Sequence, residues 1–378
     1  MATQLTTLLA TTLTLLNQFQ ETLTPTSASA TQSQAKANTT TETEKANQDA
    51  KPLALLSASS SALKAQVTKL SLLSITTPFT PSAITTVLRA VNESVLPSLI
   101  TASLLVTPAE YTKAFHLEIL TLSRTVLAEF AALVGIVKDI AEKDLSEKDK
   151  KDMSKAEKDV VTVAAGRVWD ACDVVTNTAG KGVVGFVMHR VEQWRDLIRD
   201  AVEEIEEWDP EEGDDFFDDL MGGEKGDDDD DDDDEDEDED EEDNAALLER
   251  KKSTLRFLKP ISQIYPAVIN NRLKNAGEIP LSVKGGVAKL EALMLKLGRV
   301  PDLVDEAAGA LYEDDAERSV EFLKDIRRNA TETVTSLELP WDEKKEANGV
   351  QAAGDKFTVW SRTWLKVMEE VGKSIETA

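Results

Sequence analysis

The stretch FHLEILTLSRTVLAEFAALVGIVKDI, residues 115–140, decides the fold of this chain. Its apolar residues recur at spacings of three and four, the pattern of an α-helix that is buried along one stripe. Because the stripe continues for six or more turns, the segment is long enough to pack lengthwise in a bundle of helices. The stripe consists of Phe115, Ile119, Leu122, Val126, Phe130, Leu133, Val137 and Ile140.

The same spacing recurs along most of the chain. In residues 187–208 the apolar spacings alternate between four and three, which suits helices that pack nearly parallel to one another. We therefore predict an all-α fold of antiparallel helical bundles, with about ten helices and no strand. The last predicted stripe, near the C-terminus, consists of Phe357, Trp360, Trp364, Val367 and Val371.

Prolines mark several expected helix boundaries. Pro81 and Pro108 each suit the first turn of a helix, where the missing N–H is not needed for an intrahelical bond. Pro97, Pro260 and Pro266 instead fall inside helical patterns. We expect a kink or break at each of these three positions, because proline cannot donate a hydrogen bond to the preceding turn.

Charge separates one segment from the rest of the chain. The formal net charge is −29, and residues 200–243 alone contain 30 Asp or Glu and one Lys. The remainder is therefore electrically balanced. Asp227–Asp243 is an unbroken run of acids whose mutual repulsion predicts an extended, disordered linker.

Composition divides the chain into five parts. Residues 25–50 contain no Val, Ile, Leu, Met or aromatic residue, so apolar burial cannot offset the entropy cost of ordering them. The predicted parts are an N-terminal helix at residues 1–23, a disordered Ser/Thr-rich loop at 24–50, a helical bundle at 51–208, the acidic disordered linker at 209–244, and a C-terminal helical segment at 245–378 that is a second bundle or completes the first.

The sequence also bears on where the protein is found. Its single cysteine, Cys172, excludes an internal disulfide and fits a reducing compartment. No basic residue precedes Lys36, so the N-terminus resembles neither a signal peptide nor a transit peptide. No run approaches the ~18 apolar residues of a membrane-spanning helix, so we predict no membrane contact and a location in cytosol, nucleus or both.

Residues that commonly perform chemistry are scattered. His116 and His189 lie on different predicted helices, without the three or four converging ligands of a metal site, and we expect them at helix surfaces or boundaries. Cys172 has no evident base to activate it, and a small buried apolar role is expected. Gly180–Gly185 lacks the spacing of a phosphate-binding loop and predicts a turn between helices. We predict no catalytic residue, no cofactor and no enzymatic activity.

Two features remain as candidates for partner binding. Trp208 closes an apolar stripe where the chain enters the acidic linker, so it is either a half-exposed anchor for a partner or a seal on the bundle end. The acidic run, including Asp227, Asp234 and Asp243, is either a solvated spacer or a contact for Lys/Arg-rich proteins. Direct nucleic-acid binding is disfavoured, since Arg250–Lys252 is too short a basic run and is also weak as a nuclear-import signal.

Three short motifs in a fixed order resemble a known family. They are GRVWDACD at Gly166–Asp173, the acidic helix Val191–Pro210 that ends in Asp-Pro before an acidic spacer, and VDEAAGALY at Val304–Tyr312. Together they resemble the cyclin-D-binding protein family, the Grap- and cyclin-D-interacting proteins, from about residue 51 to about residue 328. The long pure acidic run and the loop at residues 25–50 depart from the family pattern and mark a divergent member, whose partners stay open.

This resemblance implies a function. It implies an α-helical bundle of cytoplasm and nucleus that regulates the cell cycle or transcription by binding D-type cyclins, adaptor proteins and helix-loop-helix transcription factors. The residues themselves support a second hypothesis, an acidic chaperone-like protein that binds histones, ribosomal proteins or other basic clients through Asp227–Asp243. Both hypotheses describe a protein-binding protein.

Overall fold

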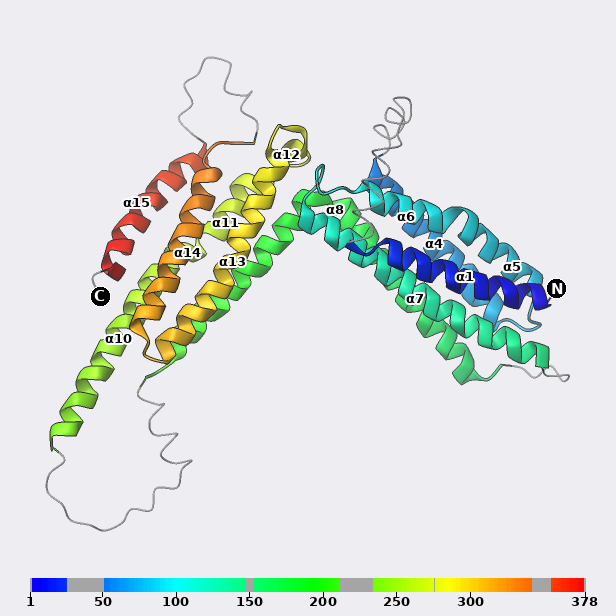
Figure 1. Ribbon diagram of the computed structural model, residues 1–378, viewed down its shortest axis with the longest axis horizontal. Coiled ribbons are helices and arrows are strands. Elements are labelled where there is room, and N and C mark those ends of the chain that lie inside the picture. The colour runs from blue at the N-terminus through cyan, green and yellow to red at the C-terminus, as the bar shows by residue number, and fades with distance from the viewer. Residues whose placement is uncertain are drawn as a thin grey trace, which may run out of the picture. The chain divides into compact units, whose positions relative to one another are not determined.

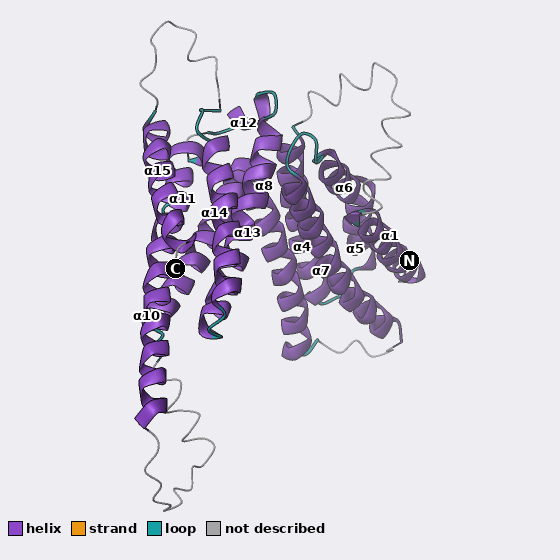
Figure 2. Ribbon diagram, turned by 60° about the vertical axis from the view of Figure 1, so that its left-hand side comes forward, coloured by secondary structure: helices purple, strands orange, loops and turns teal. Residues whose placement is uncertain are grey.

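The computed structural model describes residues 2–25, 51–146, 153–210, 234–274, 276–341 and 355–376. These residues are almost entirely helical and include no strand, which confirms the all-α prediction (Figures 1 and 2). They form two compact units, Met1–Phe186 and Val187–Ala378, each with its own set of buried apolar side chains.

The first unit is a bundle of long helices. It contains α1 (Ala2–Thr22), α4 (Pro52–Ile75), α5 (Pro81–Ala90), the π-helical turn η1 (Val91–Val95), α6 (Leu96–Leu105), α7 (Lys113–Ser146) and the first half of α8 (Lys155–Glu207). α1 packs against α7 and α5, and α4 packs against α5, η1 and α6. Ion pairs of Glu129 with Arg167 (3.3 Å) and of Lys143 with Glu157 (3.2 Å) join α7 and α8 as antiparallel neighbours.

α7 is the core helix of the first unit. Six of the eight residues of its predicted stripe are buried, and Phe115, Val126 and Phe130 have no exposed surface. By length and composition, Lys113–Lys143 is the one described helix that is apolar enough to cross a membrane. Most side chains of its predicted apolar stripe are buried in this bundle, where α7 packs on α1 and α6, which is typical of a core helix.

The start of α7 differs from the sequence prediction. Pro81 begins α5 as predicted, but the prediction for Pro108 is wrong, because α7 begins five residues later at Lys113. The hydroxyl of Thr112 accepts a hydrogen bond from the backbone N–H of Phe115 at 3.1 Å and thereby caps the first turn. A polar cap that satisfies an orphan N–H is a stronger start signal than the proline upstream.

The second unit is also all helix in its described residues. It contains the second half of α8, α10 (Asp234–Ser262), α11 (Ile264–Val268), the π-helical turn η2 (Ile269–Leu273), α12 (Ile279–Ser282), α13 (Gly286–Tyr312), α14 (Ala316–Ser336) and α15 (Lys356–Glu376). α13 and α14 form an antiparallel hairpin, and α15 packs against α14 and α10. Asp315 closes the hairpin turn by accepting a hydrogen bond from the backbone N–H of Arg318 at 3.0 Å.

Prolines inside the helical patterns act in two ways. Ahead of Pro97 the helix widens into η1, where the Leu96 N–H donates to the Val91 carbonyl five residues earlier. α10 continues through Pro260 and ends at Ser262, and helix resumes at Ile264. The break therefore lies just ahead of Pro266, because that residue has no N–H for the carbonyl of Ser262.

The division into units falls inside α8 and not at the acidic run. The predicted bundle at residues 51–208 places all of α8 in the N-terminal part, whereas the second unit begins at Val187. Val191, Ile198 and Ile205 are fully buried within that unit. The backbone departs from helical geometry at Gly182, with φ 65° and ψ −173°, where the sequence predicted a turn. The C-terminal helices therefore form a second compact unit together with the end of α8.

The predicted acidic linker at residues 209–244 lies largely outside the described residues. Its last part, Asp234–Asn244, is already helical and forms the start of α10. Two effects favour this extension. The residues that follow are packed as a helix, so the helix can propagate toward its N-terminus. The N-terminal end of a helix also carries a partial positive charge, which favours acidic side chains there. The predicted loop at residues 24–50 also lies outside the described residues after Pro25.

Candidate partner-binding site

Trp208 lies at the C-terminal end of α8 in the second unit. Its ring is half-buried and packs on Tyr312, with ring centroids 4.7 Å apart and planes tilted by 57°. Trp208 lies two residues before the end of the second family-like motif and Tyr312 ends the third, so the fold brings these two motifs together. Part of the Trp208 ring thus seals the helix ends, and part stays accessible.

Basic residues close the end of α8 behind this aromatic pair. The Lys251 ammonium donates to the carbonyl of Glu206 at 3.1 Å and to that of Trp208. Arg250 forms an ion pair with Asp314, just beyond α13. The last carbonyls of a helix lack intrahelical partners and carry partial negative charge, so a cation there is stabilising. Arg250 and Lys251, two residues of the basic run Arg250–Lys252, therefore make contacts within the second unit.

Acidic groups surround Tyr312. Burial raises the pKa of its phenol to about 12, and the charges of Glu204 and Asp305 act in the same direction. Its hydroxyl oxygen is buried and has no hydrogen-bond partner among the described residues. The Trp208–Tyr312 pair is therefore an aromatic surface in negative potential, which favours a cationic side chain from a partner.

The acidic candidates are described less fully. Asp227 lies outside the described residues. Asp234 and Asp243 lie on the first turns of α10, whose side chains are not described there.

The two histidines and the cysteine lie in different parts of the fold. His116 is buried and its Nδ1 lies 2.6 Å from the carbonyl of Val106, so it ties α7 to the end of α6, whereas His189 is exposed beside Glu192. The Cys172 thiol is buried, which raises its pKa to about 12 and disfavours the reactive thiolate. Within the ranges that the structure describes, no group of three or more metal-binding side chains converges.

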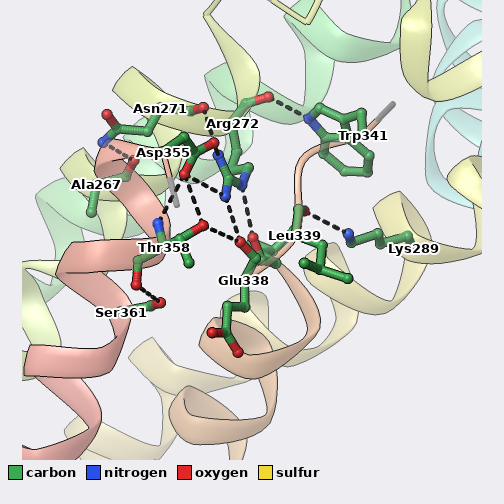
Figure 3. Close-up of polar contacts among 11 residues, drawn as sticks. Ala267, Asn271, Arg272, Lys289, Glu338, Leu339, Trp341, Asp355, Thr358 and Ser361 are labelled. Carbon is green, nitrogen blue, oxygen red and sulfur yellow. Dashed lines mark hydrogen bonds and ion pairs between the residues drawn. The ribbon is translucent and has the colours of Figure 1, made fainter. Parts of the chain in front are cut away.

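A polar cluster that the sequence did not predict, the Arg272 cluster, consists of Arg272, Asp355, Thr358, Glu338 and Trp341 (Figure 3). The Arg272 side chain is only 2% exposed and forms an ion pair of 2.6 Å with Asp355. Its Nε donates to the carbonyl of Leu337 at 2.7 Å, and one Nη donates to that of Glu338 at 2.8 Å. The local sequence offered little signal of this burial, because Arg272 follows two asparagines in the segment INNRL, Ile269–Leu273.

This cluster holds the start of α15. Asp355 precedes the helix and accepts a hydrogen bond from the backbone N–H of Thr358 at 2.9 Å, so it caps α15 while pairing with Arg272. The Arg272 guanidinium also lies 4.3 Å from the centre of the Phe357 ring. All five N–H donors of Arg272 have acceptors within this protein. The cluster therefore joins distant segments of the chain to one another.

The fold and these sites define a helical-bundle protein. Residues 55–211 match the family model described as Grap2 and cyclin-D-interacting, N-terminal. Over these residues the chain is similar to the N-terminal domain of the Grap2 and cyclin-D-interacting proteins, which confirms the family resemblance there. The matched range includes the motifs at Gly166–Asp173 and Val191–Pro210. No curated protein and no solved structure shows a significant match to the chain.

Proposed function

We propose that this protein is a non-enzymatic regulator that acts by binding other proteins, in the cytoplasm and the nucleus. The observation that carries the proposal is the match of residues 55–211 to the Grap2 and cyclin-D-interacting domain. Its partners are a D-type cyclin, a Grap2-like adaptor or a helix-loop-helix factor, and its role lies in control of the cell cycle or transcription.

Geometry supports one end of the second unit as a contact surface. A half-buried tryptophan at the edge of a packed core is the type of residue that dominates binding energy in protein interfaces. Glu204 and Asp305 make the surroundings of this aromatic pair negative. The complementary partner surface carries an Arg or Lys that reaches the ring of Trp208.

The test is capture of purified partners by the immobilised full chain. We expect a D-type cyclin, a Grap2-like adaptor or a helix-loop-helix factor to be retained, and Trp208→Ala to weaken the retained complex by about tenfold or more. The matched control is Leu295→Ala, because Leu295 is 75% exposed on α13 and away from the aromatic pair. Helical content of each variant is checked by circular dichroism. Capture of none of the three partner classes by the wild-type chain would sink the proposal.

The second candidate function is binding of basic proteins such as histones or ribosomal proteins. The observation that favours it is the unbroken acidic run Asp227–Asp243, which lies in the segment that holds the chain's net charge. Replacing this run with a Gly/Ser segment of equal length should abolish histone binding, and added salt should weaken binding by the wild-type chain, since charge is screened within about 8 Å at physiological ionic strength. If the replacement binds histones as well as the wild type does, the run is a spacer.

A further inference from the structure

The C-terminal helix α15 packs against α10, η2 and α14, and the surface of these elements that it covers is called the groove below. One face of the helix enters the groove, and the opposite face is charged or exposed. Residues 342–354, which precede it, are outside the described residues. The groove-facing residues that are buried are Phe357, Thr358, Ser361, Trp364, Met368, Val371 and Gly372.

Two polar groups of the groove select particular side chains of the helix. The Arg272 guanidinium receives the carboxylate of Asp355 with contacts of 2.6 and 3.1 Å. The carbonyl of Pro260, in the last turn of α10, accepts a hydrogen bond from the indole N–H of Trp364 at 2.8 Å. Carbonyls in the last turn of a helix have no intrahelical N–H, so this acceptor is available to an incoming side chain. The groove thus recognises an acidic cap and an indole on one helix.

Most of the hydrogen bonds of Arg272 do not involve α15. Three of the five go to carbonyls of Asn271, in η2, and of Leu337 and Glu338, just after α14. Departure of α15 would remove the Asp355 carboxylate and the Phe357 ring and leave these three bonds to orient the guanidinium. A prepositioned cation beside an apolar groove is a receptor for a helix with a matching cap.

We propose that this groove is a docking site for an amphipathic helix of a partner protein, and that α15 is its intramolecular occupant and competitor. The partner helix carries Asp at its N-cap, Phe two positions later and Trp nine positions later, as α15 does with Asp355, Phe357 and Trp364. The inference rests on the proposed protein-binding function and assigns it a second surface, separate from Trp208. Partner binding at this site requires α15 to leave.

The test uses a fluorescent peptide with the sequence of residues 355–376 as the probe. The full-length double variant Asp355→Ala, Trp364→Ala weakens the resident helix, and it should bind the peptide with an anisotropy change. The wild-type chain should bind it at least about tenfold more weakly, because its own tethered helix competes at an effective concentration near millimolar. The matched control Val359→Ala changes a 57% exposed residue of α15 and should behave as the wild type does. A peptide carrying the same two substitutions should not bind.

A second measurement does not depend on the folding of that variant. Met368 lies on the buried face of α15 and is 1% exposed, so a Met368→Cys thiol in the otherwise wild-type chain reports departure of the helix. Its rate of labelling by a thiol reagent should rise with peptide concentration and then saturate. The native cysteine, Cys172, is buried in the first unit and stays silent under these conditions.

Helix exchange can be refuted independently of the proposed function. Equal peptide affinity for the wild-type chain and a folded double variant, or labelling of Met368→Cys that is independent of peptide, would overturn helix exchange. Both measurements use only this chain and its own peptide. A failure to capture a cyclin or an adaptor would therefore leave them unaffected, and the reverse also holds.

Discussion

Replacement of Arg272 by Ala tests how the second unit is held together. Its guanidinium makes five hydrogen bonds from a side chain that is 2% exposed. Two of these bonds end on Asp355, which is 40% exposed, so water replaces much of their contribution. The two short bonds to the carbonyls of Leu337 and Glu338 have no such replacement, and each charge-assisted bond contributes about 1.5–3 kcal/mol. We expect the free energy of unfolding to fall by about 3–5 kcal/mol, mainly because these two bonds are lost and the carbonyls are left without a donor.

Urea unfolding monitored by tryptophan fluorescence measures this loss, because five of the six tryptophans lie in the second unit. Arg272→Lys should recover only part of the stability, since an ammonium cannot reproduce the planar fork of donors. The matched control is Arg318→Ala, which removes exposed pairs with Glu306 and Glu313 and should cost less than about 1 kcal/mol. If Arg272→Ala costs no more than Arg318→Ala, Arg272 does not hold α15 and the reasoning fails.

Three further predictions concern pH, thiol reactivity and helix packing. Burial raises the pKa of Asp355, but the hydrogen bonds from Arg272 and from the α15 backbone outweigh it and hold the pKa below its ordinary value of 3.8. The ionised Asp355 carboxylate therefore stabilises the fold fully above its unfolded-state pKa, and this stabilisation is lost as the pH falls through its folded-state pKa. When the free energy of unfolding is measured at decreasing pH, the wild type should show this loss and Asp355→Asn should not. Burial raises the pKa of the Cys172 thiol to about 12, so a thiol reagent at mildly alkaline pH should label it only after urea opens the first unit. Gly286→Ala should destabilise the second unit by about 1–3 kcal/mol in thermal unfolding, because its Cβ would meet a backbone carbonyl at 1.9 Å, whereas Gly309→Ala meets nothing within 4 Å and should be neutral or stabilising.

The sequence by itself determined the helical elements and their buried faces. A spacing of three and four predicts which side of residues 115–140 is buried, because that side is set by the helical repeat and by the apolar residues themselves. The last helix follows its predicted stripe only in part. Val367 is 40% exposed there and Trp360 only half-buried, while Met368 takes the core position. The family motifs were likewise recognisable from local sequence, and the family match over residues 55–211 confirms the two that lie within it.

Only the tertiary structure decided which distant segments meet. Arg272 and Asp355 are 83 positions apart, and no local pattern links them. The pairing of Trp208 with Tyr312 and the capping of α8 by Lys251 also join separate helices. The tertiary structure also decides that the end of α8 belongs to the second unit. Helical periodicity shows that a face is buried but not against which partner, because many helices offer similar apolar stripes and only simultaneous packing of all of them selects one arrangement.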